Sequence, residues 1–182
     1  FAVGAALTLA LPATRASSPA RLGPALHALA GRPFLVPFLV AATLHGATQF
    51  TYDALFGVHV AELGLASRWT GAAIVTGIVV EVALMAFGRA LLGRVRPLHL
   101  FAAAAGVGAV RWLLTSILVD PIPLVAVQAL HGVSFGLFWI AGVETMRARA
   151  DASIRTSAQA LFATCAFGVG PLLASGLAAA LL

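Results

Sequence analysis

Long apolar stretches constrain this chain more than any other feature of its sequence. At least four of them exceed 18 residues, and an α-helix of about 20 residues crosses the roughly 30 Å hydrocarbon layer of a membrane. Only 9% of all residues are charged, whereas about a quarter are charged in a water-soluble domain. Because so few charges cannot cover a soluble surface, the sequence predicts an all-α, polytopic transmembrane helical bundle.

Turn and breaker residues divide the apolar sequence into five spanning segments. The sequences LGLAS, RVRP and VDPIP are typical of connections between helices. The segments are expected at about 34–62, 69–93, 97–118, 122–148 and 155–181. Residues 1–11 are apolar but too short to span, so they are expected to end a preceding transmembrane helix. Residues 12–33 are rich in Pro, Ser, Ala and Arg, which predicts a loop.

The basic residues, all of them arginines, are divided unequally between the two sides of this predicted bundle. One side carries Arg68 alone, with Glu62 and Asp120. The other side carries Arg15, Arg21, Arg32, Arg89, Arg94, Arg96, Arg147, Arg149 and Arg155. Basic residues concentrate in cytoplasmic loops, so the loop 12–33 and the connections near Arg94 and Arg147 are predicted to be cytoplasmic. The basic character therefore reflects topology, and no nucleic-acid partner is expected.

Polar side chains gather on one side of the helix expected at 34–62. Taking about 100° per residue, they fall within an arc of about 140°, and Phe56 joins them. The polar residues of this arc are His45, Thr48, Gln49, Tyr52, Asp53 and His59. A transmembrane helix with one such face is expected to turn it toward a polar cavity.

The following helices each add a polar group at membrane depth. They contribute Glu81, then Arg111, then Gln128 and His131 one turn apart. A charged side chain at the bilayer centre costs about 3 kcal/mol on insertion scales. Four neighbouring helices are therefore expected to bring these groups together inside the bundle, with Arg111 paired to Glu81, Asp53 or both.

Structural roles are the alternative interpretation for some of these residues. His131 and His59 could each bond a backbone carbonyl at a helix interface, and Trp112 and Trp139 could serve as packing or interfacial anchors. Phe56 and Phe138 could supply apolar contacts in the cavity.

Several polar residues are expected outside the cavity. Glu144 is expected to pair with Arg147 at a helix end, and Asp151 with Arg155 as a solvated i,i+4 pair. The single cysteine, Cys165, lies in an apolar segment and excludes an internal disulfide.

Enzyme signatures are lacking in the sequence. It contains no GxSxG, HExxH or GxxxxGK[ST] pattern, and its histidines lack the spacing of a zinc site. No catalytic residue, metal or cofactor is therefore expected. Gly132, Gly136 and Gly142 are suited to close helix packing.

Five short sequences carry a family resemblance. They are LHGATQFTYDALF, GIVVEVALMAF with GRALLGRVRP, GAVRWLL, VQALHGVSFGLFW and RTSAQALF. Together they resemble the C-terminal half of a major facilitator superfamily transporter over about residues 33–176. Within that superfamily the chain is most similar to phenylpropionate permease-like proteins, and more distantly to nucleoside and oligosaccharide proton symporters.

The resemblance implies a domain organisation, and the chain departs from the family pattern at one position. Residues 1–11 would end the sixth helix, 12–33 would be the cytoplasmic link between halves, and 34–182 would hold helices seven to eleven. The N-terminal half and the last helix would lie outside this fragment. Oligosaccharide symporters carry a Glu three residues after the His of the tenth helix, where this chain has Ser134 after His131. Glu81 is therefore the better proton carrier in this half.

These features together predict a secondary transporter in a plasma membrane such as a bacterial inner membrane. It would move a small organic solute by alternating access. Proton symport is the preferred hypothesis. The alternatives are a proton-driven efflux antiporter and a non-transporting membrane receptor or scaffold with the same fold. Its partners would be the solute, protons, membrane lipid and the missing N-terminal half. Proton coupling is assigned to Glu81, Arg111 and Asp53. Substrate binding is assigned to His45, Gln49, Tyr52, Gln128, His131 and Phe135.

Overall fold

The computed structural model describes residues 23, 27 and 31–181, with the side chains of 177–181 left out of the description. Within these residues the chain forms helices and no strand, so the predicted all-α bundle is confirmed. The helices are α3 (Leu35–Glu62), α4 (Arg68–Ala86), α5 (Gly88–Leu92), α6 (Pro97–Ile117), α7 (Pro121–Val127), α8 (Ala129–Arg149), α9 (Arg155–Thr164), a π-helix (Cys165–Val169) and α10 (Gly170–Leu181). The predictions for 1–11 and for nearly all of 12–33 fall outside the described residues.

Four helical segments are long and apolar enough to cross a membrane. They are Arg68–Ala86, Pro97–Ile117, Pro121–Arg149 and Arg155–Gly176. Helix α3 is the fifth predicted span and has 28 residues, ample length for a crossing. It is not among those four because polar side chains interrupt its apolar sequence.

Three of the predicted segments are interrupted in the structure. The segment 69–93 divides at Phe87 into α4 and α5, and the segment 155–181 contains the π-helix. The segment 122–148 divides at Gln128, where the backbone tightens. There Gln128 N donates to the Val125 carbonyl at 3.1 Å, and His131 N donates to the Gln128 carbonyl at 3.0 Å. These i to i+3 bonds are of the 3₁₀ type, which often marks a functional or strained point in a helix.

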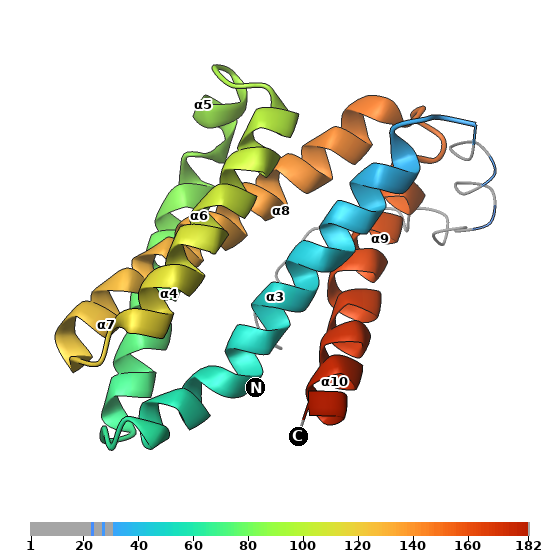
Figure 1. The fold of residues 1–182 in the computed structure, drawn as a ribbon. Helices are drawn as coiled ribbons and strands as arrows, with labels where there is room; N and C mark the ends of the chain where they lie inside the picture. Colours follow the sequence, from blue (N-terminus) through green and yellow to red (C-terminus); the bar gives the residue numbers. More distant parts are fainter. Residues whose placement is uncertain (1–22, 24–26, 28–30, 182) are drawn as a thin grey trace, which may run out of the picture.

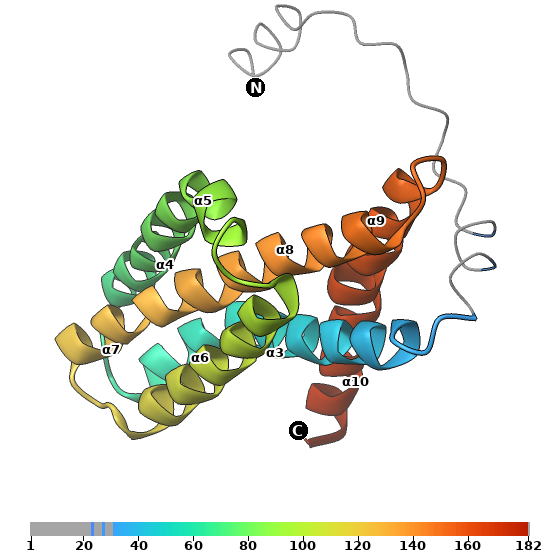
Figure 2. The ribbon, with the colours of Figure 1, turned by 90° about the horizontal axis from the view of Figure 1, so that it is seen from above.

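Helix α8 runs through the bundle between α4 and α6 (Figures 1 and 2). Helix α3 crosses the bundle and packs against the π-helix and α10. Glycines permit the closest crossings. A Cβ atom at Gly132 would collide with the carbonyl oxygen of Gly77 on α4, and one at Gly170 would lie 2.8 Å from the carbonyl oxygen of Thr43 on α3. Gly136 and Gly142 likewise meet Leu84 and Phe162, which confirms the predicted role of these glycines in packing.

Two apolar clusters fill the bundle at different depths. Phe38, Phe101, Phe138 and Phe162 belong to one of them. Tyr52, with Phe56, Val60 and Leu124, belongs to the other. Along α3, the buried polar residues His45 and Gln49 lie between Ala42 of the first cluster and Tyr52 of the second.

The charged residues at the arginine-rich end bear out one prediction and contradict another. Arg147 Nε donates to Glu144 Oε2 at 2.6 Å, as expected for a pair at a helix end. The Asp151–Arg155 pair does not form among the described residues. Asp151 lies in the turn before α9, which begins at Arg155, so the spacing of an i,i+4 pair on a helix does not apply. Cys165 is a free thiol in the π-helix.

Candidate functional site

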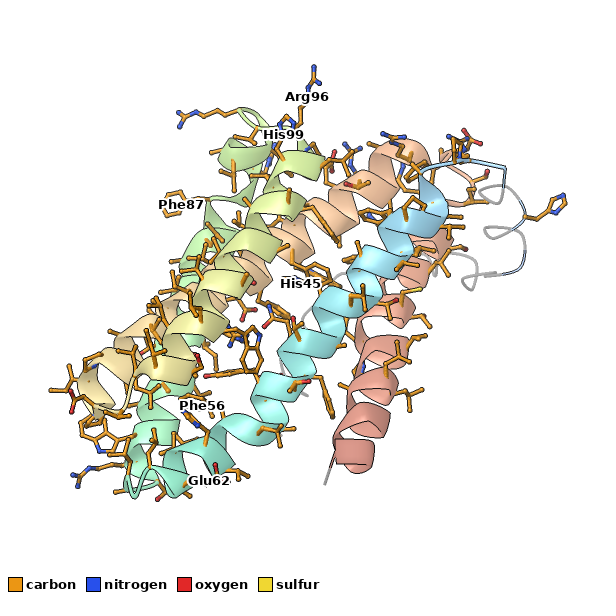
Figure 3. The ribbon with its side chains drawn as sticks, viewed as in Figure 1. His45, Phe56, Glu62, Phe87, Arg96 and His99 are labelled. Carbon is orange, nitrogen blue, oxygen red and sulfur yellow. The ribbon has the colours of Figure 1, made fainter. Side chains whose placement is uncertain are left out.

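A layer of buried polar side chains separates the two apolar clusters. Its side chains come from α3, α6, the α7–α8 junction and α8. Its buried members are His45, Gln49, Arg111, Thr115, Gln128 and Ser134. Figure 3 shows His45 on α3, directed toward the interior of the bundle. Polar groups at this depth must find partners within the protein or in a bound ligand, because lipid offers none.

Arg111 lies at the centre of this layer and is only 1% exposed. It belongs to the buried face of α6, which also includes Ala104, Gly108 and Thr115 at helical spacing. Its guanidinium carbon lies 4.4 Å from the centroid of the Tyr52 ring. Its Nη2 donates to Gln49 Oε1 at 3.4 Å. Its Nε has no hydrogen-bond partner among the described residues.

The expected ion pair of Arg111 with Glu81 or Asp53 is not formed. Among the described residues, neither carboxylate lies within 4.0 Å of the guanidinium. The reason lies in the rotation of α3. Tyr52 faces inward, and Asp53, one residue or about 100° further round the helix, is exposed. Arg111 still interacts electrostatically with Asp53, at longer range than an ion pair.

Ser134 joins three helices through a chain of hydrogen bonds. Its Oγ donates to the carbonyl oxygen of Ala104 at 3.0 Å and accepts from Gln49 Nε2 at 3.2 Å. The same Gln49 amide donates to His45 Nε2 at 3.1 Å, so that ring nitrogen acts as the acceptor. The sequence singled out Ser134 only as a departure from a family pattern. Its position three residues after His131 was the available signal.

Aromatic contacts extend the layer from Tyr52 toward α8. The ring centroids of Tyr52 and His131 are 4.7 Å apart, and those of His131 and Phe135 are 6.2 Å apart. Gln128, which is 0% exposed, donates through Nε2 to Thr115 Oγ1 at 3.3 Å. Thr115 was not expected in the site, because a lone threonine in an apolar helix carries no distinguishing signal. All six predicted substrate-binding residues are thus close to one another in the bundle.

Several buried polar atoms in this region have no hydrogen-bond partner among the described residues. They are Tyr52 Oη, His59 Nε2, Arg111 Nε, Trp112 Nε1, Gln128 Oε1 and His131 Nδ1. Leaving a buried donor or acceptor unsatisfied costs about 1–3 kcal/mol. Such a concentration of unsatisfied atoms indicates a place where water or a polar ligand supplies the missing partners.

Two cavities open between α3 and α6 beside this layer. One, of about 290 Å³, is lined by Tyr52, Phe56, His59, Trp112 and Thr115, among others. The other, of about 350 Å³, is lined by His45, Thr48, Phe101, Gly108 and Trp112, among others. Trp112 borders both cavities, and its indole nitrogen is one of the unsatisfied donors. The sequence suggested only packing or anchoring for this residue.

The two intramembrane acids lie at the edge of the layer. Glu81 is half-buried on α4. A Cβ atom at Gly132 would lie 2.7 Å from the backbone nitrogen of Glu81. The α4 backbone at Glu81 therefore passes beside Gly132, the residue that follows His131 on α8. Neither Glu81 nor Asp53 forms an ion pair or hydrogen bond with another described residue. The two carboxylates interact electrostatically with each other. Asp53 also interacts electrostatically with the buried Arg111, without forming an ion pair with it.

Comparison with protein-family models adds the decisive observation. The model described as the MFS_1 like family matches residues 12–180. The chain belongs to this family. No curated protein and no solved structure matches the chain.

Membership of the MFS_1 like family places the chain in the major facilitator superfamily and makes it a multi-pass membrane transporter. The buried polar layer lies between helices of this bundle, and the solute sites of secondary transporters lie near mid-membrane between helices. The match assigns the family and no role to an individual residue.

Proposed function

We propose that this chain belongs to a proton-coupled symporter, which moves a small organic solute across the membrane by alternating access. The observation that carries the proposal is that the intramembrane acids Asp53 and Glu81 form no ion pair among the described residues, although a buried arginine lies in the same bundle. A carboxylate held in an ion pair exchanges its proton poorly. Glu81 and Asp53 have no such partner among the described residues; they interact electrostatically with each other, and Asp53 also interacts with the buried Arg111.

The charge of this group favours coupling. With neutral histidines, Asp53, Glu81 and Arg111 together carry one net negative charge. Uptake of a single proton therefore neutralises the group. Neutral groups are much easier to enclose in a medium of low dielectric constant than charged ones. We assign the proton to Glu81, because it is half-buried and lies beside the helix that carries Gln128 and His131.

The solute would occupy the space bordered by Tyr52, Gln128 and His131. Tyr52 Oη and Gln128 Oε1 lack partners among the described residues, so they can donate to and accept from a polar solute. The rings of Phe56 and Phe135 flank Tyr52 and His131 and favour a solute with an apolar or aromatic body. A solute combining both characters fits the chemistry of these side chains.

A Glu81→Gln variant of the full-length transporter, reconstituted in vesicles, tests the proposal. The amide mimics a permanently protonated carboxyl group. We expect the variant to exchange solute across the membrane at equilibrium but to fail to accumulate it against a gradient. Glu144→Gln is the matched control, because Glu144 pairs with Arg147 at a helix end and should leave accumulation intact.

The direction of the proton gradient separates the alternatives. A symporter accumulates solute when the gradient points inward, an efflux antiporter requires the opposite gradient, and a receptor or scaffold responds to neither. Accumulation by the Glu81→Gln variant at the parental level would remove Glu81 from the coupling mechanism.

A further inference from the structure

A second, separate pocket lies at the arginine-rich end of the bundle, between the start of α6 and the end of α8. It has a volume of about 310 Å³, and Arg96, His99, Thr145 and Arg149 are among the residues that line it. Figure 3 shows Arg96 and His99 at this end, where α6 begins. The pocket is far along α6 and α8 from the buried polar layer and shares no lining residue with the cavities there.

The side chains of this pocket carry positive charge without a balancing acid. Arg96 and Arg149 both line it, and no carboxylate does. Glu144, one residue before Thr145, is already bound by Arg147 through two hydrogen bonds of 2.5 and 2.6 Å. The guanidinium of Arg149 rests 4.2 Å from the centroid of the Phe34 ring, which orients the group. Like charges that border one pocket favour an anion as its occupant.

Thr145 supplies an independent indication of a ligand. The residue is only 3% exposed, and its Oγ1 has no hydrogen-bond partner among the described residues. A hydroxyl group buried in a pocket with two arginines is suited to donate to an anionic oxygen. Helix α6 also begins at this pocket and has no side-chain cap. The positive end of its dipole is therefore directed toward the same space.

The outer face of α6 continues from the pocket along the length of the helix. This face carries small residues, with exposed Leu98, Val110, Leu113 and Ile117 beside them. A smooth apolar surface leading away from a cationic pocket fits a molecule that has an anionic head and hydrocarbon chains. Inorganic phosphate would use the pocket alone and leave this surface uncovered.

We propose that this pocket binds the phosphate group of an anionic phospholipid. Arg96 and Arg149 would bind the phosphate oxygens, the Thr145 hydroxyl would donate a further hydrogen bond, and the acyl chains would lie along the outer face of α6. Basic pockets between transmembrane helices on the cytoplasmic side are suited to such head groups. The bound lipid would hold the ends of α6 and α8 together.

The test measures binding of phosphatidylglycerol to the purified full chain in detergent by native mass spectrometry. We expect each arginine to contribute about a fivefold factor in affinity, so R96Q/R149Q should bind about twenty-fivefold more weakly. Thr145→Val should weaken binding about fivefold through the lost hydrogen bond. Arg94→Gln is the control, because Arg94 lies in the same connection but does not line the pocket.

Two further measurements separate the possible ligands. Phosphatidylcholine should bind more weakly than phosphatidylglycerol, because the arginines repel its choline group. Inorganic phosphate at millimolar concentration should not displace the lipid. Equal binding of both lipids, full displacement by phosphate, or parental affinity in R96Q/R149Q would each overturn the proposal. Unchanged melting temperatures of the variants without added lipid would show that reduced binding does not arise from misfolding.

Discussion

The guanidinium of Arg111 and the ring of Tyr52 form a cation–π pair, with 4.4 Å between the guanidinium carbon and the ring centroid. The same ring contacts His131, so one aromatic side chain connects α6, α3 and α8. This pair occupies the place where an ion pair was expected. The aromatic ring stabilises the buried cation, and neither Asp53 nor Glu81 forms an ion pair with it among the described residues.

The Tyr52 ring should therefore contribute measurably to stability. A desolvated cation–π contact contributes about 2 kcal/mol. We expect Tyr52→Leu to lower the free energy of unfolding by about this amount. Tyr52→Phe keeps the ring and should stay within about 0.5 kcal/mol of the parent, because the Tyr52 hydroxyl has no partner to lose. Denaturation in mixed micelles measures both, and equal losses would show that the ring face is unimportant.

Ser134 should act as a structural link within the polar layer. Replacing it with Ala removes the bonds to Gln49 and to the Ala104 carbonyl, at an expected cost of about 1 kcal/mol for each. Ser153 is exposed, so Ser153→Ala serves as the control and should change stability by less than about 0.5 kcal/mol. If both variants unfold at the same denaturant concentration, the hydrogen bonds of Ser134 do not stabilise the bundle.

The glycines of the bundle should differ sharply in their tolerance of alanine. A methyl group at Gly132 would collide with the Gly77 carbonyl oxygen, so Gly132→Ala forces α4 and α8 apart. We expect a loss of about 3 kcal/mol or failure to fold. Gly106 has open space around its Cβ position, and Gly106→Ala should stabilise α6 by up to about 1 kcal/mol. Thermal unfolding of the two purified variants compares them directly, and equal melting temperatures would contradict the close crossing.

The arginine distribution predicts the orientation of the chain. In a background where Cys165 is replaced by Ala, a membrane-impermeant thiol reagent should modify Ser67→Cys from outside the cell. Ser153→Cys should react only after the membrane is permeabilised. Both positions are exposed, so differences in labelling report sidedness rather than burial. The reverse pattern would invert the topology.

The sequence by itself determined the helical class, the approximate spans and the identity of the polar residues at depth. Each of these depends on local properties. Hydropathy over about 20 residues decides whether a segment crosses a membrane, and a rotation of about 100° per residue decides which side chains share a face. The arc that contains His45, Gln49 and Tyr52 therefore follows from the sequence alone.

The tertiary structure decided which groups meet. Arg111 faces Tyr52 and Gln49 rather than Asp53, because the rotation of α3 against α6 separates adjacent residues by about 100°. How α3 lies in the bundle depends on where backbones can approach, as at Gly170, where α10 meets the α3 backbone at Thr43, and no periodicity encodes it. Ser134 and Thr115 belong to the site because their hydrogen-bond partners lie outside their own helices. Their side chains are unremarkable in one helix and acquire partners only when other helices pack beside them.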